Sequence, residues 1–260
     1  MQEVIRIRES QKRIGGRKLF FMLQEFLHLH SIAIGRDSFF DLLGRQGMLV
    51  RKSRRHTPVT TWSNHWFRKH PNRIKDFVPL RAGRLWVSDI TYVHVSSRFA
   101  YLSLVTDAYS RKIVGCCLSK NLSADGCVAA LKMALKNNPD IEHLIHHSDR
   151  GVQYCCSEYV SVLEKASVRI SMTQHGDPLE NAIAERVNGI LKSELLESRY
   201  NSFKEAVEGV KHAITIYNHE RPHTSINMLT PAQAHHLEGG IKRLWKNYHY
   251  KKKEGPAVQA

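Results

Sequence analysis

The chain has 260 residues, of which 42% are hydrophobic, which favours one large and one smaller domain and excludes a chain that is disordered throughout. It contains no apolar run of 18 or more residues, and its start lacks a signal peptide's apolar stretch, so we expect a soluble cytoplasmic protein without contact to a membrane. The net charge of +15 is concentrated at the two ends: residues 1–80 hold 16 Lys and Arg against six Asp and Glu, and residues 237–260 hold six against two. Basic flanks around a nearly neutral middle indicate binding to a polyanion, and a ribosomal or membrane-surface protein is the alternative.

The first 48 residues predict short helices. Apolar side chains recur at helical spacing in residues 17–30, and a second apolar helix is expected after Asp37, which we take as its N-cap. Two short helices in a basic segment resemble a helix-turn-helix, although a plain packing module has the same pattern. Residues 49–80 are rich in charge, Pro, Ser, Thr and Asn without any period, which predicts a basic linker.

From residue 84 onward the pattern predicts strands and then alternating helices and strands. Strands are expected at 84–95, 98–110, 112–119, 143–148 and 168–173, and helices at 123–138 (capped by Ser123), 157–167, 179–197 and 203–219. Three hairpin-like strands followed by this alternation imply an α/β sheet of mixed direction with helices on its faces. The five cysteines show neither disulfide nor zinc spacing and are interpreted as small apolar residues in a reducing compartment.

Two aspartates occupy unusual places in the predicted strands. Asp89 lies in the middle of the first strand, where a charge is costly unless it is paired or binds a metal. Asp149 comes directly after the strand 143–148 and shortly before Gly151, which by itself suits a tight turn. If the two strands are neighbours, both carboxylates emerge at one edge of the sheet.

The predicted helix 179–197 offers a third acid. Its apolar residues form one stripe, and Asn181, Glu185, Asn188 and Lys192 form the opposite face. Such a face usually meets water. The alternative is that Glu185 binds a metal while Lys192, two turns further along the same line, reaches a phosphate.

These motifs resemble those of DD-E transposases of the insertion-sequence type, in the second-reading-frame (OrfB) form whose catalytic core is similar to retroviral integrase. The matching stretches are WVSDITY with Asp89, HHSDRGVQY with Asp149, ENAIAERVNGILKSE with Glu185 and Lys192, and YNHERPHTSI followed by TPAQA. The interval 150–184 between the second Asp and the Glu is 35 residues, as in that family. The chain departs from the family's YDNA at PLENA, where Glu180 replaces Asp and becomes the nearest rival to Glu185.

The resemblance implies an RNase H-like core over residues 81–236, with the helical module 1–48 and linker 49–80 before it and a basic tail 237–260 after it. It implies a transposase that nicks DNA and transfers a strand with Asp89, Asp149 and Glu185, which hold two Mg²⁺ ions, with Mn²⁺ as a substitute. Implied partners are element-end and target DNA, further copies of the chain on DNA, and a fused or separate upstream-frame DNA-binding protein; the implied location is the bacterial nucleoid. A catalytically silent DNA-binding regulator and a simple RNase H-like nuclease are the alternatives.

Four further residues are candidate DNA contacts: Lys192, Asn188, Arg150 and His147. His147 and Arg150 flank Asp149, so they either touch a DNA phosphate or shape the turn that presents the carboxylate. Asp177, Glu180 and Glu194 are acids near the predicted site that we do not assign to it. Tyr217, Asn218, Arg221, Pro222 and His223 favour a structural or DNA-backbone role.

Overall fold

The computed structural model describes residues 1–50, 65–139, 141–174, 178–242 and 244. Its helices are α1 (Gln2–Ser10), α2 (Gly16–Met22), α3 (Gln24–Leu29), α4 (Arg36–Arg45), α5 (Ala124–Asn137), α6 (Val152–Cys155), α7 (Ser157–Lys165), α8 (Ala182–Ile190), α9 (Phe203–His219) and α10 (Pro231–His235). Its strands are β1 (Leu85–Val95), β2 (Arg98–Asp107), β3 (Ile113–Ser119), β4 (Ile145–Ser148) and β5 (Arg169–Met172). Short 3₁₀ turns at Pro178–Asn181 and Thr224–Ile226 precede α8 and α10, and a π-helical turn, η2 (Leu191–Leu195), extends α8.

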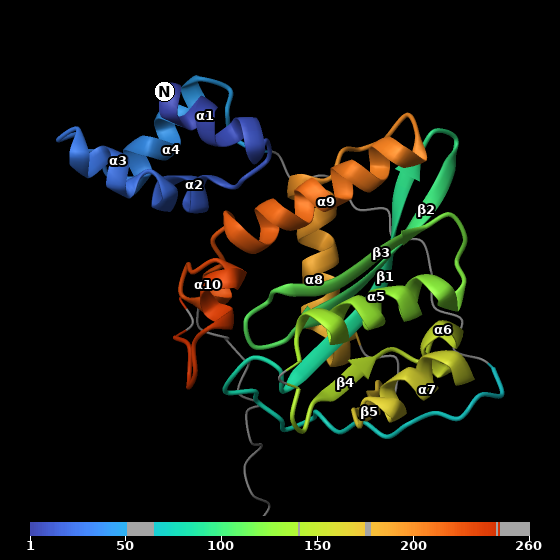
Figure 1. The fold of residues 1–260 in the computed structure, drawn as a ribbon. Coiled ribbons are helices and arrows are strands. Elements are labelled where there is room, and N and C mark those ends of the chain that lie inside the picture. Colours follow the sequence, from blue (N-terminus) through green and yellow to red (C-terminus); the bar gives the residue numbers. More distant parts are fainter. Residues whose placement is uncertain (51–64, 140, 175–177, 243, 245–260) are drawn as a thin grey trace, which may run out of the picture.

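The five strands form one mixed sheet in the order β3-β2-β1-β4-β5 (Figure 1). The first three strands pair antiparallel as two successive hairpins, whereas β4 joins β1 in parallel and β5 joins β4 in parallel. The parallel strands are reached through crossovers that carry α5 and α7, as parallel pairing requires. The sequence prediction of a mixed α/β sheet with flanking helices is confirmed.

Helices cover both faces of the sheet, and the alternation of side chains along the strands supplies a core to each. On β2, Val105 joins the cluster that contains Leu131 of α5 and Leu163 of α7. Its neighbour Leu104 points to the other face and joins the cluster that contains Val187 of α8 and Val210 of α9. This period of two is what a strand buried on both sides provides, and it leaves α8 packed directly against β1.

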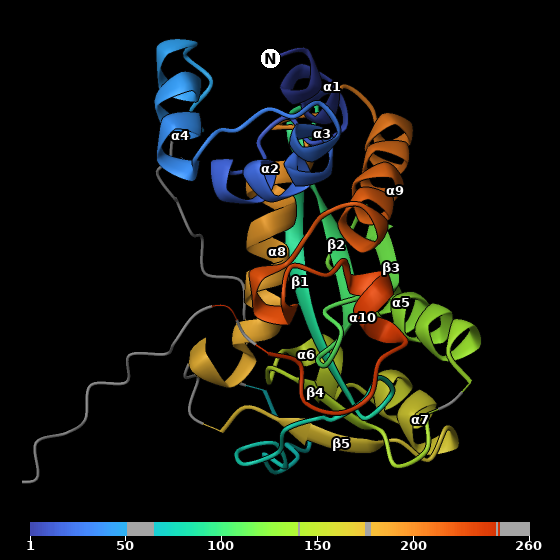
Figure 2. The ribbon, with the colours of Figure 1, turned by 90° about the vertical axis from the view of Figure 1, so that its left-hand side faces the viewer.

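The four N-terminal helices form a module with a small core of their own, which lies beside α9 and the far end of α8 (Figures 1 and 2). Leu19 and Leu43 are fully buried in that core, which explains why residues 1–48 show helical periodicity. The second predicted helix begins two residues earlier than expected: α4 starts at Arg36 with Gly35 as its N-cap. Asp37 therefore is not the cap, and its carboxylate instead accepts a bond from the side chain of Arg36.

The predicted linker packs on the core where the structure describes it. Phe67 is half-buried against the cluster that contains residues of α5 and α7, whereas Ile74 and Phe77 are half-buried against the cluster that contains Leu85 and Ala184. Residues 51–64 of the linker, and residues 243 and 245–260 of the predicted basic tail, lie outside the described residues. Residue Gly239 of the tail donates a backbone bond of 2.7 Å to Leu80, so the two flanks of the core meet.

The predicted helix 179–197 consists of three segments. A 3₁₀ turn leads into α8, and the last five residues form the π-helical turn η2. Helix α9 was predicted with the observed bounds, and Ser123 precedes α5 as expected. The short helices α6 and α10 had no predicted counterpart, because four or five residues are too few to show a period.

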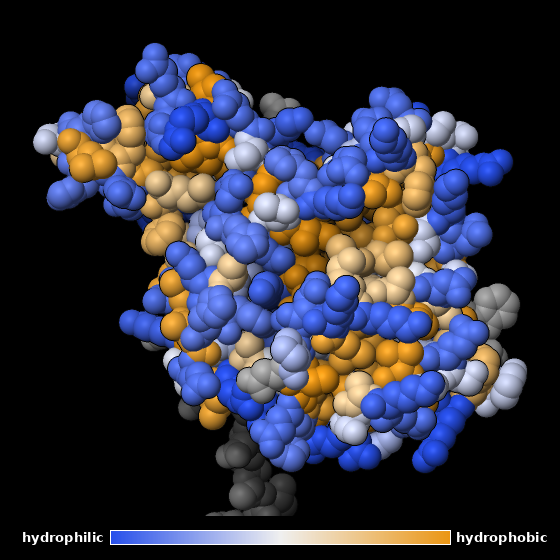
Figure 3. Space-filling view, viewed as in Figure 1, coloured by the Kyte–Doolittle hydropathy of each residue, from blue (hydrophilic) through white to orange (hydrophobic). Residues whose placement is uncertain are grey.

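One side of the molecule is notably apolar at its surface. Figure 3 shows hydrophobic side chains between α9 and α5, above β3, and again between α5 and α7. At the end of β3, the side chains of Cys116, Cys117 and Leu118 are half-buried. In the described part of the chain, no helix has the length and apolar character needed to cross a membrane.

Candidate active site

The parallel pairing of β1 and β4 brings the two predicted aspartates together. Val87 pairs with His147, and the register therefore places Asp89 beside Asp149 two residues further along. Strand β4 ends at Ser148, so Asp149 leaves the sheet where β1 continues. Both carboxylates line one hollow of about 20 Å³, room for about one water-sized occupant.

The turn after β4 holds Asp149 in place. The backbone N–H of Gly151 donates to Oδ1 of Asp149 at 2.9 Å, a local Asx-type bond. A Cβ atom at Gly151 would lie 3.0 Å from the same carboxylate oxygen, so a side chain there would press on it. The tight turn therefore also holds the carboxylate of Asp149 in position.

Asp89 is half-buried and is held by two hydrogen-bond donors. Its Oδ2 accepts a bond of 2.7 Å from the side-chain amide of Asn188, and its Oδ1 accepts one of 2.9 Å from the N–H of Ile90. Burial, and next the charge of Asp149, raise the pKa of Asp89 to about 7, against the lowering effect of these bonds. Two carboxylates this close repel each other, and a cation between them would relieve that repulsion.

Glu185 approaches the pair from α8. Its charge adds to the raised pKa of Asp89, so the three acids share one electrostatic field. Glu185 is exposed, however, and does not line the hollow. Within the described ranges no three His, Cys, Asp or Glu side chains are arranged so that they could hold a metal ion.

The polar face of α8 meets β1 as well as water. Asn181 and Asn188 are each only 6% exposed, and Asn181 donates to the backbone oxygen of Ser88 at 3.0 Å. Lys192 is exposed, with its ammonium 4.4 Å above the ring of Tyr92, which also lines the hollow. Burial lowers the pKa of Lys192, and the attraction of Asp89 opposes this change. Lys192 thus places a cation beside the acids, whereas Asn188 faces Asp89 and not the solvent.

The two histidines before Asp149 are internal. His147 is fully buried with its Nδ1 2.8 Å from the hydroxyl of Ser171, and burial lowers its pKa to about 4. His146 lies between the hydroxyls of Ser88 and Tyr159, and burial lowers its pKa to about 3. Both rings are neutral at pH 7. Of the two predicted roles for His147, this geometry favours shaping of the turn.

Two other acids near the site are bound within the fold. Glu180, the rival to Glu185, accepts bonds from the side chain of Asn72 and the backbone N–H of Gln174. Asp107, fully buried at the end of β2, accepts bonds from the N–H groups of Gly83 and Ser110. Asp177 lies outside the described residues.

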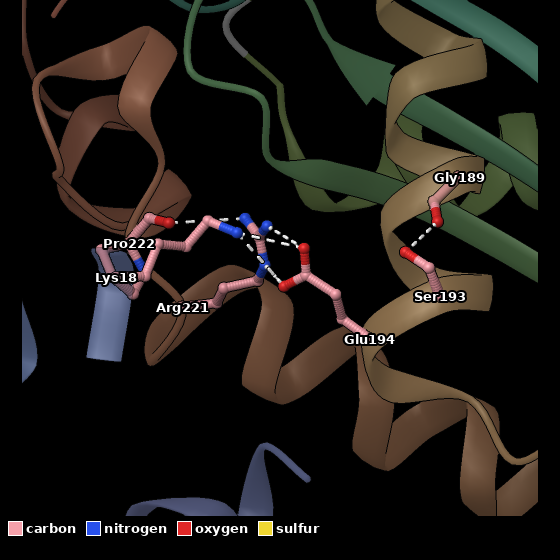
Figure 4. Close-up of polar contacts among 6 residues, drawn as sticks. All are labelled: Lys18, Gly189, Ser193, Glu194, Arg221 and Pro222. Atoms are coloured by element: carbon pink, nitrogen blue, oxygen red, sulfur yellow. Dashed lines mark hydrogen bonds and ion pairs between the residues drawn. The ribbon is translucent and has the colours of Figure 1, made fainter. Parts of the chain in front are cut away.

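Glu194, which the sequence left unassigned, joins the N-terminal module to η2, the π-helical extension of α8 (Figure 4). Arg221 donates two bonds of 2.9 Å to its carboxylate, and the ammonium of Lys18 in α2 lies 3.0 Å away. The side chain of Arg221 is 1% exposed, and that of Glu194 is 16% exposed. Burial acts to raise the pKa of Glu194, but Arg221 and then Lys18 outweigh it and lower the value. Nothing local to η2 signals these partners, which are 27 and 176 residues away in the sequence.

The segment 217–223, for which a structural or DNA-backbone role was predicted, makes its described contacts within the fold. The side-chain amide of Asn218 exchanges two bonds with the backbone of Ile113, at 2.9 and 3.0 Å. Arg221 donates to the carboxylate of Glu194, and the rings of His223 and Tyr217 pack edge to face. These contacts fasten α9 to β3 and to η2 rather than to the hollow.

Known proteins resemble this chain in both sequence and fold. A family model described as the integrase core domain matches residues 79–178, and a second model of the same description matches residues 166–231. An uncharacterized 31 kDa protein of insertion element IS600 from Shigella sonnei is 34% identical over 232 residues, which cover 88% of this chain and 82% of that protein. Transposase InsF for insertion sequence IS3A from Escherichia coli K12 is 30% identical over 194 residues, covering 74% and 67%. The simian T-cell lymphotropic virus intasome, solved with PP2A regulatory subunit B56 gamma, contains a chain of similar fold, with a TM-score of 0.52 and 18% identity over 92% of this chain and 77% of that one.

Proposed function

Because the chain belongs to the insertion-sequence transposases with an integrase core domain, we propose that Asp89, Asp149 and Glu185 carry out its DNA cleavage and strand transfer. The observation that carries this proposal is the β1–β4 register, which sets two half-buried carboxylates side by side at a small hollow. A charge pair of this kind is costly for a fold to keep without a function.

The donor set fits divalent ions, and we propose two Mg²⁺, with Mn²⁺ as a substitute. Carboxylate oxygens are the ligands that Mg²⁺ prefers, and the raised pKa of Asp89 reflects its burial and the nearby charge of Asp149, which a bound cation would offset. Asp89 would serve both ions, Asp149 one and Glu185 the other, with the exposed side chain of Glu185 turning toward the aspartates. When bound, such ions supply positive charge at the attacked phosphate and at the leaving oxygen.

Other residues of the chain would orient the acids and bind the DNA. Asn188 fixes the carboxylate of Asp89, and the turn at Gly151 fixes that of Asp149. Lys192 and Arg150 are the predicted residues best placed to contact a DNA phosphate, because each lies next to an acid and reaches the surface. The helical module 1–48 and the basic flanks would hold further DNA, with other copies of the chain and an upstream-frame protein as the proposed partners.

The test uses element-end DNA with Mg²⁺ and compares the wild type with Asp149→Asn and Glu185→Gln. Each variant should lose at least about a hundredfold in nicking, since even partners of a metal ligand are worth 10–100-fold. Glu180→Gln is the matched control and should nick like the wild type, because Glu180 is occupied by Asn72 and Gln174. DNA binding is measured separately, without metal. Equal nicking by all proteins would show that these acids do not carry the cleavage, and no nicking where binding is demonstrated would favour the silent regulator instead.

A further inference from the structure

An aromatic side chain beside the turn of Asp149 is almost fully exposed. Trp66 is 87% exposed, although tryptophan is usually a largely buried residue. Its ring stacks on that of Phe67, with centroids 4.3 Å apart and planes inclined by 28°. The indole thus rests on a supporting ring and keeps most of its surface for an external partner.

The residues on both sides of Trp66 are fixed to the core. Nε2 of His65 lies 2.8 Å from the backbone oxygen of Arg150, the residue that follows Asp149. Phe67 packs against the cluster beneath the sheet that contains residues of α6 and α7. Trp66 is therefore held beside the turn that carries a proposed catalytic acid, and its position is set by two neighbours.

The surroundings of Trp66 are cationic. Arg68 and Lys69 follow it and are exposed, and Arg150 is half-buried. Burial, and next Asp149, raise the pKa of Cys155 to about 11, whereas Lys69 and Arg150 act in the opposite direction. Both cations therefore lie near Cys155 in α6, within the field of Asp149. An aromatic platform among cations is the combination that binds single-stranded nucleic acid.

We propose that Trp66 stacks on an unpaired base of the DNA, next to the phosphate that the acids hold. This inference rests on the proposed function, which brings DNA to the hollow. Bases inside a duplex have both faces covered by their neighbours, so the open face of Trp66 selects a base that is splayed out or lies in a single-stranded tail. Stacking tolerates every base, because each has a π-face. The cations at Lys69 and Arg150 would hold the adjoining backbone.

The experiment measures binding to two DNA probes in metal-free buffer: a blunt duplex, and the same duplex with an unpaired tail that contains 2-aminopurine. Trp66→Ala should weaken binding of the tailed probe by about 5- to 150-fold and change the affinity for the blunt duplex less than about twofold. The wild type should quench the 2-aminopurine, and Trp66→Ala should not. Trp66→Phe should restore most of the affinity and the quenching.

Met133→Ala serves as the control, since it also removes an exposed apolar side chain. It should bind both probes like the wild type. Equal weakening of both probes by Trp66→Ala, or no change in either, overturns the inference. A shift in oligomeric state on Trp66→Ala without a selective loss for the tailed probe also overturns it, in favour of a surface between copies. If the wild type binds neither probe, the proposed DNA-directed function is wrong. If the wild type binds and nicks DNA, and Trp66→Ala binds both probes like the wild type, only the inference about Trp66 is wrong.

Discussion

Asn188 donates a hydrogen bond of 2.7 Å to Oδ2 of Asp89, and this bond ties the helix of Glu185 to the strand of Asp89. Asn188 lies three residues after Glu185 on α8. A shift of the helix would therefore change the surroundings of Glu185 and of Asp89 together. Its burial leaves the amide little access to DNA. The bond acts as an orienting contact, of the kind that supports a metal ligand from behind.

Replacement of Asn188 should therefore impair catalysis more than DNA binding. Asn188→Ala removes the donor, and we expect about a 10- to 100-fold loss of strand transfer together with a higher Mg²⁺ requirement. Ser193→Ala, which alters an exposed hydroxyl further along the same helical segment, should leave both unchanged. The measurement is a Mg²⁺ titration of nicking beside metal-free DNA binding. A parallel loss of both would restore the interpretation of Asn188 as a DNA contact.

The raised pKa of Asp89 predicts that this acid destabilises the metal-free fold at neutral and alkaline pH. The unfolded carboxyl ionises near 3.8 and the folded one near 7, so the folded state binds more protons between these values and stability falls as pH rises through them. Asp89→Asn should then increase the free energy of unfolding at pH 8 by about 1–3 kcal/mol, and by much less at pH 4, with the smaller figures reflecting the partial exposure of Asp89.

Urea denaturation in EDTA checks this value, with Asp41→Asn in α4 as a control for loss of an exposed carboxylate. Added Mg²⁺ should stabilise the wild type and not Asp89→Asn, because only the wild type retains the ligand. A wild type that is more stable than Asp89→Asn in EDTA at pH 8 would contradict the expectation that the ionised carboxylate of Asp89 destabilises the metal-free fold.

Much of the core follows from sequence periodicity, because the strands alternate and α9 has a regular apolar stripe between a Ser cap and a Pro-containing turn. Asp89 and Asp149 were both identified from their places in strands, but their proximity depends on the pairing of Val87 with His147. No local pattern specifies which strands pair. That information resides in the long-range packing of the sheet.

Helical periodicity also cannot say what a polar face meets. Asn181 and Asn188 share the face of Glu185 and Lys192, yet the first two are buried against β1 and the last two are exposed. The oxygen atoms of the half-buried strand β1 can accept hydrogen bonds from side-chain amides instead of from water. The role of Glu194 was missed for a similar reason, since its partner Lys18 is 176 residues away.

Replacement of Glu194 should strongly destabilise the fold. Glu194→Gln leaves Arg221, 1% exposed, without its counter-ion, and breaking a buried pair in this way costs about 3–5 kcal/mol. Glu197 offers a matched control three residues away: it pairs with Lys12 of the same N-terminal module, but both side chains are more than half exposed. Glu197→Gln should cost less than about 1 kcal/mol. Equal effects in thermal or urea unfolding would show that burial does not distinguish the two contacts.

Lys18 gives the contact between module and core an unusual dependence on pH. Burial, and next the charge of Arg221, lower its pKa from 10.5 to about 8, while Glu194 acts against them and Arg186 adds to the lowering. Between pH 8 and 10.5 the unfolded chain therefore carries a proton at Lys18 that the folded chain has lost. Stability rises with pH wherever the unfolded state binds more protons, so this residue's contribution should improve as pH increases through that window.

The free energy of unfolding of the wild type minus that of Lys18→Met isolates the contribution. We expect this difference to increase by about 1–3 kcal/mol from pH 8 to 10.5, because one pKa unit corresponds to about 1.4 kcal/mol. Lys12→Met is the control for loss of an exposed lysine of the same module, since Lys12 pairs with Glu197 in the solvent. A difference that decreases with pH would mean that the ion pair with Glu194 outweighs the burial of Lys18. The module would then be held to η2 by attraction to Glu194, and alkaline pH would release it.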